Sequence, residues 1–87
     1  MNFEKEFKKL GFEKTTDNET MLVYKDKKHY TKDLSGKDRE FNDTRIIIFK
    51  KKVNRVFLKR ILEGVENEPF PLTAELLDLI QKQLSNI

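Results

Sequence analysis

The chain has 87 residues, of which 38% are charged and 37% are hydrophobic, and its net charge is +3. A chain of this length can build only one hydrophobic core, so we expect a single small domain spanning residues 1–87. It contains no cysteine, which excludes a disulfide framework and thiolate metal sites. No apolar run approaches the length of a membrane span or a signal-peptide centre, so we expect a cytoplasmic protein.

The N-terminal residues have the pattern of a short amphipathic helix. Phe3, Phe7 and Leu10 recur at helical spacing and would form one apolar stripe. Asn2 can cap the start of the helix, and Gly11 stands where a left-handed residue ends one. A helix this short is marginal in water, so we expect its phenylalanines to dock on a sheet.

Two extended segments follow, at residues 12–16 and 20–26. Between them lie Asp17, Asn18 and Glu19, residue types that favour turns through local hydrogen bonds. The pattern predicts a β-hairpin.

Residues 25–43 are strongly polar and have few large apolar side chains. A structureless loop of this length would be unusual in so small a domain. We therefore expect a short edge strand near residues 29–32, followed by a mobile loop around residues 35–36.

The most β-prone part of the chain comes next. Residues 45–49 and 55–61 are dense in β-branched and aromatic side chains, and residues 50–54 between them are polar enough to form a turn. This pattern predicts a second hairpin.

The C-terminal segment predicts an amphipathic helix. Pro71 blocks an earlier start, Thr73 can serve as the N-cap, and Leu72 and Leu77 have the spacing of a hydrophobic staple. We expect one apolar face formed by Leu76, Leu77, Ile80, Leu84 and Ile87.

These elements together indicate an α+β fold. We expect an N-terminal helix, an antiparallel sheet of four or five strands arranged in hairpins, and a C-terminal helix packed on one face of the sheet. The chain has neither the βαβ alternation that would demand a parallel sheet nor an internal repeat.

Seven cations and no acid lie between Asp43 and Glu63, which leaves 11 cations and 15 acids elsewhere. Two short helices can cover only one face of the sheet, so part of the other face should be apolar, basic and exposed. Such a surface suits an acidic partner. An alternative is that the lysine and arginine stems cover the sheet edges and guard them against aggregation. The candidate partner-binding residues are Arg45, Lys50, Lys51, Lys52, Arg55, Phe57, Lys59 and Arg60.

The chain offers little for catalysis. His29 is the only histidine, and neither Ser35 nor Ser85 has a predicted base beside it. The three glycines are too far apart for a phosphate-binding loop. The polar segment has four carboxylates without the spacing of a calcium loop, namely Asp33, Asp38, Glu40 and Asp43. We expect no catalytic residue, no cofactor and no metal site, and therefore a protein that is not an enzyme.

The pattern of the whole chain resembles a group of small proteins. A short helix ending in Leu-Gly-Phe, an acidic hairpin, an Ile-Ile-Ile-Phe strand paired with a Val-Phe-Leu strand, and the C-terminal helix look like small α+β proteins of phages and mobile elements of low-GC Gram-positive bacteria. The resemblance implies no activity or cofactor. It implies accessory proteins that act by binding, including inhibitors of host enzymes or of defence systems, such as anti-CRISPR proteins.

Two functions therefore remain open. The first is a protein-binding module that uses the exposed sheet face or an edge strand, with a homodimer as one form of this. The second is a nucleic-acid-binding protein that uses the basic hairpin at residues 45–60, with Phe49, Phe57 and Tyr24 as candidate stacking residues. The small net charge favours the protein partner.

Overall fold

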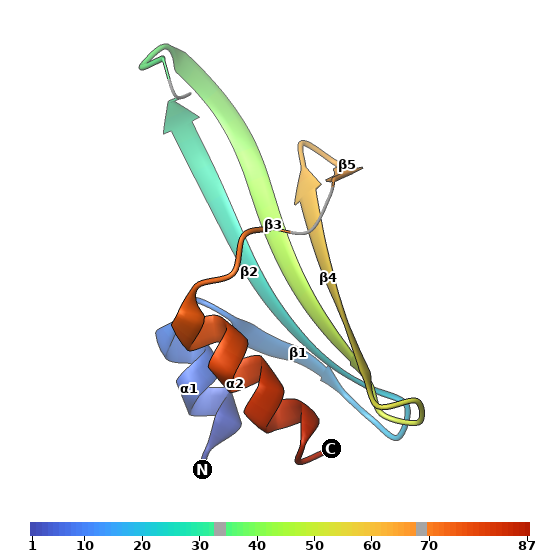
Figure 1. Ribbon diagram of the computed structural model, residues 1–87. Coiled ribbons are helices and arrows are strands. Elements are labelled where there is room, and N and C mark those ends of the chain that lie inside the picture. The colour runs from blue at the N-terminus through green and yellow to red at the C-terminus, as the bar shows by residue number, and fades with distance from the viewer. Residues whose placement is uncertain (33–34, 68–69) are drawn as a thin grey trace.

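The computed structural model of the protein describes residues 1–32, 35–67 and 70–87 (Figure 1). Within these residues the chain forms two helices and five strands. The elements, in chain order, are α1 (Phe3–Lys9), β1 (Glu13–Asp17), β2 (Met21–Lys32), β3 (Asp38–Lys50), β4 (Arg55–Leu62), β5 (Val65–Asn67) and α2 (Ala74–Leu84).

The strands form one antiparallel sheet in the order β1-β2-β3-β4-β5, so each strand pairs with its neighbours in sequence. Both helices contribute to one core with the same face of the sheet, beside β1 and β2 (Figure 1). The predicted α+β fold is confirmed, including the C-terminal helix on one face.

The start of the chain forms as its residues predict. The side chain of Asn2 caps α1 by accepting a hydrogen bond from the backbone N–H of Lys5, at 3.1 Å. After the helix, Gly11 adopts a φ of +92°, a left-handed conformation that other residues rarely adopt. The tight reversal returns the chain directly into β1 and keeps Phe7 and Phe12 against the sheet.

Asn18 builds the turn between β1 and β2. Its side-chain oxygen accepts hydrogen bonds from the backbone N–H groups of Thr20 and Met21, at 2.9 and 3.0 Å. This is the local bonding by which asparagine favours turns. The predicted turn is confirmed, and β1 carries in addition a bulge between Lys14 and Thr16.

Aromatic rings from three elements form the centre of the core. Phe7 of α1 stacks on Tyr24 of β2 at a centroid distance of 3.9 Å, and Phe49 of β3 meets both rings edge-on at 6.2 Å. All three side chains are buried, and they lie beside Ile47 and Ile80. Together they dock α1 and α2 on the sheet.

A buried hydrogen bond joins the sheet to α2. The Tyr24 hydroxyl donates to Gln83 Oε1 at 3.1 Å, and both residues are buried. Burial disfavours the phenolate and raises the pKa of Tyr24 from 10.0 to about 12. The bond satisfies two polar groups that would otherwise destabilise the core.

The apolar face of α2 differs from the predicted one. Leu77 is 43% exposed and Ile87 is 39% exposed, whereas Leu79 and Gln83 are buried together with Leu76 and Ile80. At 100° per residue, Leu77 lies well to one side of the direction shared by the buried side chains. Leu76 and Ile80 of the predicted face are buried and Leu84 packs against the core, so the prediction is confirmed for these three and wrong for Leu77 and Ile87. Four apolar residues in the five positions 76–80 left the choice between Leu77 and Leu79 open, and packing in the fold selected Leu79.

The polar segment at residues 25–43 forms no separate edge strand at residues 29–32. Those residues are instead the far end of β2, which pairs with β3 along nearly its whole length. Near this end Tyr30 lies opposite Phe41, and their rings stack at 4.8 Å. The β2–β3 hairpin extends beyond both helices as an arm (Figure 1), and the molecule is 43 Å long. Ser35 and Gly36 lie in the turn region of the arm, but residues 33–34 of the expected loop lie outside the described residues.

The packing of α2 gives a direct test of the core. Ile80→Ala should lower the free energy of unfolding by about 2 to 5 kcal/mol, because it leaves a cavity between α2 and the sheet. Leu77→Ala, one turn earlier on the exposed side, should change it by no more than about 0.5 kcal/mol. Urea denaturation followed by circular dichroism measures both. Equal losses in the two variants would contradict this orientation of α2.

The environment of Tyr24 gives a pH-dependent test. A Tyr30→Phe variant retains only Tyr24 as a tyrosine, so its ultraviolet titration reports one phenol. In the folded protein the midpoint should lie near pH 12, and in denaturant it should return to about 10. Because the unfolded chain then loses this proton first, stability should fall as pH rises from about 10 to 12. A folded-state midpoint near 10, with circular dichroism showing intact structure, would mean that the hydroxyl is open to water.

Candidate functional site

The sheet face turned away from both helices is called here the open face. Side chains alternate between the two faces along each strand, so the strand pairing decides which residues lie on it. As far along β2, β3 and β4 as Lys27, Thr44 and Ile61, its residues are Met21, Val23, Lys25, Lys27, Thr44, Ile46, Ile48, Lys50, Arg55, Phe57, Lys59 and Ile61.

An apolar row crosses the open face. Val23 lies opposite Ile48, and Ile48 lies opposite Phe57 on the next strand. Val23 is buried, Ile48 is half-buried, and the ring of Phe57 is 44% exposed. The row therefore becomes more accessible toward β4, where it ends in a solvent-exposed aromatic ring.

Cations flank this row on both sides. Lys50 and Arg55 lie directly opposite each other on one side, and Lys25 and Lys59 lie on the other. Lys59 pairs with Glu66 of β5, at 3.6 Å between Nζ and Oε1. Within the described residues, Lys25, Lys50 and Arg55 have no carboxylate in ion-pair distance, so their charges are free to attract an acidic partner.

The predicted site residues divide between the two faces. Lys50, Arg55, Phe57 and Lys59 lie on the open face, as described. Arg45 and Arg60 project instead from the face that carries the helices, where each has a carboxylate partner. The structure therefore does not bring all eight candidates together.

Arg60 holds Asp43 in a bidentate pair. Its Nε and one terminal nitrogen donate to the two oxygens of Asp43, each at 3.0 Å. The hydrogen bonds and the charge of this carboxylate raise the pKa of the Arg60 guanidinium above its usual range. Asp43 is buried, so the pair stabilises the sheet beyond the reach of the helices.

Arg45 is bound still more closely. Its guanidinium donates a hydrogen bond to the buried carboxylate of Asp26. It also lies over the rings of Phe12 and Phe70, at 4.9 and 5.4 Å from their centroids. A cation held by one carboxylate and two aromatic rings serves the fold and is not available to a partner.

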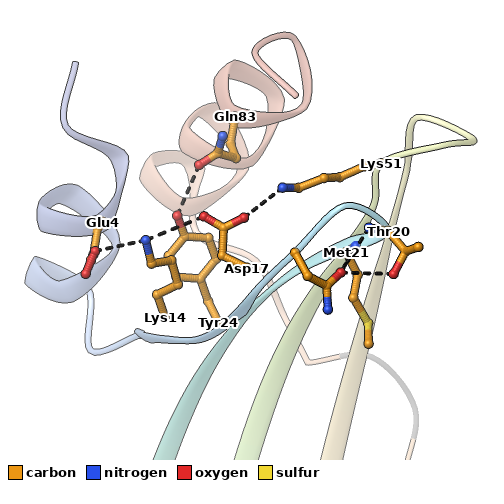
Figure 2. A network of polar contacts seen from close by, with 9 residues as sticks. Glu4, Lys14, Asp17, Thr20, Met21, Tyr24, Lys51 and Gln83 are labelled. Atoms are coloured by element: carbon orange, nitrogen blue, oxygen red, sulfur yellow. Dashed lines mark hydrogen bonds and ion pairs between the residues drawn. The ribbon is translucent and has the colours of Figure 1, made fainter.

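Lys51 belongs to a chain of ion pairs at the end of the sheet (Figure 2). Its Nζ donates to Asp17 at 2.7 Å, Asp17 also pairs with Lys14 at 3.6 Å, and Lys14 pairs with Glu4 of α1 at 3.2 Å. The hydrogen bond from Lys51 lowers the pKa of Asp17, and Glu4 raises the pKa of Lys14. Lys51 thus links two turns and α1, whereas Lys52 is exposed in the turn between β3 and β4.

Only one of the three candidate stacking residues is accessible. Phe49 and Tyr24 are at most 1% exposed, because both pack against Phe7 in the core. Phe57 is the remaining candidate on the open face. A nucleic-acid surface normally stacks successive bases on several rings, and of the three predicted rings this face offers one.

The polar arm carries the residues weighed for metal binding and catalysis. His29 is exposed, and its Nδ1 lies 3.0 Å from Asn42 Oδ1. Within the described part of the chain no three residues among histidine, cysteine and the acids are grouped as metal ligands, and Asp33 lies outside that part. Ser85 Oγ donates to the Gln81 carbonyl at 3.1 Å, as a residue at the end of α2.

The ion pairs on the helix side were not predicted from the sequence, although a signal for them exists. Asp26 follows Leu22 and Tyr24 at the two-residue spacing of one strand face, and Arg45 precedes Ile47 and Phe49 at the same spacing. This periodicity places both charges on the buried face. Because a buried charge needs a partner of opposite sign, the spacing marks both residues as candidates for buried ion pairs, but it does not assign them to each other.

Comparisons with family models, with curated proteins and with solved structures found no match to this chain. Within the described residues, no helix combines the length and the apolar character that a membrane span requires.

The two classes of arginine should behave differently when removed. Arg45→Ala leaves the buried Asp26 carboxylate without its main partner, so the free energy of unfolding should fall by about 1 to 3 kcal/mol. Arg55→Ala removes an exposed cation and should change stability by no more than about 0.5 kcal/mol. Urea denaturation of both variants at neutral pH measures the difference. If Arg45→Ala were as stable as the wild type, its assignment to the fold would be wrong.

Proposed function

We propose that this chain is a small, non-enzymatic protein-binding module of the cytoplasm, which binds an apolar and acidic surface of its partner through the open face around Phe57. The observation that carries the proposal is the exposed Phe57 ring beside Arg55 and Lys50, two cations without a carboxylate partner within the described residues. The proposal requires no cofactor.

The chemistry of this face suits a protein partner. Aromatic residues and arginine are enriched where binding energy concentrates, and cations around an apolar centre accelerate association with an acidic surface. Phe57 would supply the apolar contact, and Lys50, Arg55 and Lys25 would align the partner. In this proposal the module acts by occupying a surface of its partner, as the resemblance to accessory and inhibitory proteins of mobile elements implies.

A nucleic-acid partner is less well supported by the same residues. The burial of Phe49 and Tyr24 leaves Phe57 alone as a stacking platform on this face. Arg45 and Arg60 are held in ion pairs with buried carboxylates, and Lys51 pairs with Asp17. The cations of the basic hairpin that remain unpaired are too few for a strong phosphate-binding surface.

The test compares three variants with the wild type in a pull-down from the native source, scored for both protein and nucleic acid. Phe57→Ala and Arg55→Glu should each lose a protein partner that the wild type retains, because they alter the centre and the rim of the open face. Lys5→Glu makes the same charge change on α1, on the other side of the sheet, and should retain the partner. Circular dichroism confirms that each variant is folded.

A parallel titration with labelled single- and double-stranded oligonucleotides tests the other partner class. We expect the wild type not to bind either oligonucleotide with sub-micromolar affinity at physiological salt. Sub-micromolar binding there, lost in Arg55→Glu but kept in Lys5→Glu, would overturn the proposal in favour of a nucleic-acid-binding protein.

A further inference from the structure

β4 is an edge strand for much of its length. On its outer side β5 pairs only with Arg60, Ile61 and Leu62. Within the described residues no strand pairs with Arg55–Lys59 on that side, and this stretch is called here the β4 edge. By Phe70 the chain is packed in the core against Phe12, on the helix side of the sheet.

The turn between β4 and β5 shows which backbone groups the β4 edge presents. Leu62 and Val65 enclose a two-residue turn, in which Glu63 and Gly64 both have positive φ, at 52° and 75°. The residues that enclose such a turn exchange backbone hydrogen bonds, and the pattern alternates along the strand. The N–H and C=O groups of Leu62 therefore point toward β5, away from β3. Every second residue of β4 points the same way, so the N–H and C=O groups of Leu58 and Val56 also point away from β3.

The side chains of this edge are apolar on both faces. Phe57 is exposed on the open face, and Val56 and Leu58 are half-buried on the helix side, where they contact the core. Three consecutive apolar residues beside unpaired backbone groups form a template for another strand. Arg55 and Lys59 stand at the two ends of this stretch, both on the open face.

The charges of β5 indicate which side chains suit a strand beside β4. Its Glu66 lies opposite Ile61 on the open face, and it forms the ion pair with Lys59. The protein's own added strand thus places a carboxylate beside a β4 cation. A strand that continued this arrangement along the β4 edge would meet Lys59 and Arg55 with acidic residues and Phe57 with an apolar one.

We infer that the β4 edge binds an extended segment of the partner protein as an additional strand, with the pattern acidic, apolar, apolar, apolar, acidic. The acidic residues lie beside Arg55 and Lys59, the central apolar residue covers Phe57, and its two neighbours cover Val56 and Leu58. This inference rests on the proposed function, and it adds the conformation and sequence pattern of the partner.

A second copy of the chain is disfavoured at this edge in the register centred on Phe57. Antiparallel pairing of two β4 strands about Phe57 would place Arg55 of each copy opposite Lys59 of the other. Like charges in directly opposite positions destabilise a strand pair. In this register, which covers the same residues as the proposed segment, charge complementarity favours an acidic segment over a second copy.

The test uses a fluorescent peptide with the central sequence Glu-Val-Phe-Val-Glu, flanked on each side by Thr-Gly-Ser spacers. One matched control replaces both Glu with Lys, and another carries N-methyl groups on the two Val residues, whose N–H groups would face Val56 and Leu58. Fluorescence anisotropy measures affinity, and amide exchange by NMR measures protection of individual backbone N–H groups.

The Glu peptide should bind the wild type and protect the amides of Val56 and Leu58 from exchange. The Lys peptide and the N-methylated peptide should each bind at least about tenfold more weakly, a loss of the size expected for paired charges and blocked backbone hydrogen bonds. A Val56→Pro variant of the protein removes the backbone N–H of residue 56, which points away from β3, so no hydrogen bond to β3 is lost. Proline is tolerated at such edge positions. The variant should also weaken binding about tenfold; if it does not fold, the N-methylated peptide makes the same test on the wild type.

Three results would overturn the inference. One is no binding of the Glu peptide at millimolar concentration. Another is equal binding of the N-methylated peptide, which would place the contact on the open face and not at the edge. The third is protection of Val56 and Leu58 without peptide, together with concentration-dependent sedimentation, which would identify a second copy as the occupant. None of these depends on the native partner, whose retention by Phe57→Ala would separately contradict the proposed function.

Discussion

The stacking of Phe7 on Tyr24 decides the rest of this structure. The two rings, 3.9 Å apart, dock α1 on one face of β2, and Gln83 of α2 binds the same tyrosine through its hydroxyl. Because side chains alternate along a strand and successive strands are in register, this contact assigns every other residue of the sheet to one face or the other. A shift of one residue would bury Lys25 and expose Tyr24.

Two short helices cannot cover a sheet whose central hairpin is longer than either of them. Beyond the ends of the helices, ion pairs take the place of apolar packing on this face of the sheet. Asp26 with Arg45, and Asp43 with Arg60, occupy the positions that follow the apolar core along the strands. Each pair satisfies a buried carboxylate with an arginine, and Phe12 and Phe70 cover one of the arginines. These pairs extend the ordered sheet into a region with too little apolar surface to form a core.

Within the described residues, both helices lie on the face opposite the open face, and no strand pairs with the β4 edge. The open face has an apolar row flanked by cations, and the row becomes most accessible at Phe57. Phe57 lies in the stretch Arg55–Lys59 of β4, with which no strand pairs on the outer side in the part of the chain that the structure describes. A single extended acidic segment could therefore contact the face through Phe57 and the edge through the backbone of Val56 and Leu58. In the proposed mode of binding, the open face around Phe57 and the β4 edge are two sides of one region.

The local elements of this protein follow from its amino-acid sequence. Asn2, Gly11, Asn18 and Thr73 act through hydrogen bonds or backbone conformations within a few residues of themselves, so their turns and caps were predictable. The alternation of β3 and β4 likewise predicted which of their side chains share a face. What the alternation could not say was which of the two faces the helices would cover.

The use of the charges, in contrast, depends on contacts across the fold. Arg45, Arg60 and Arg55 are equivalent in a basic sequence segment, yet the first two face buried carboxylates and the third faces solvent. The same holds for Leu77 and Leu79, whose order of burial depends on the angle at which α2 meets the sheet. Ion pairs between distant strands and the rotation of a helix are set by residues far away in the chain. The periodicity of one segment does not determine them, because it is satisfied equally well by the alternative arrangement.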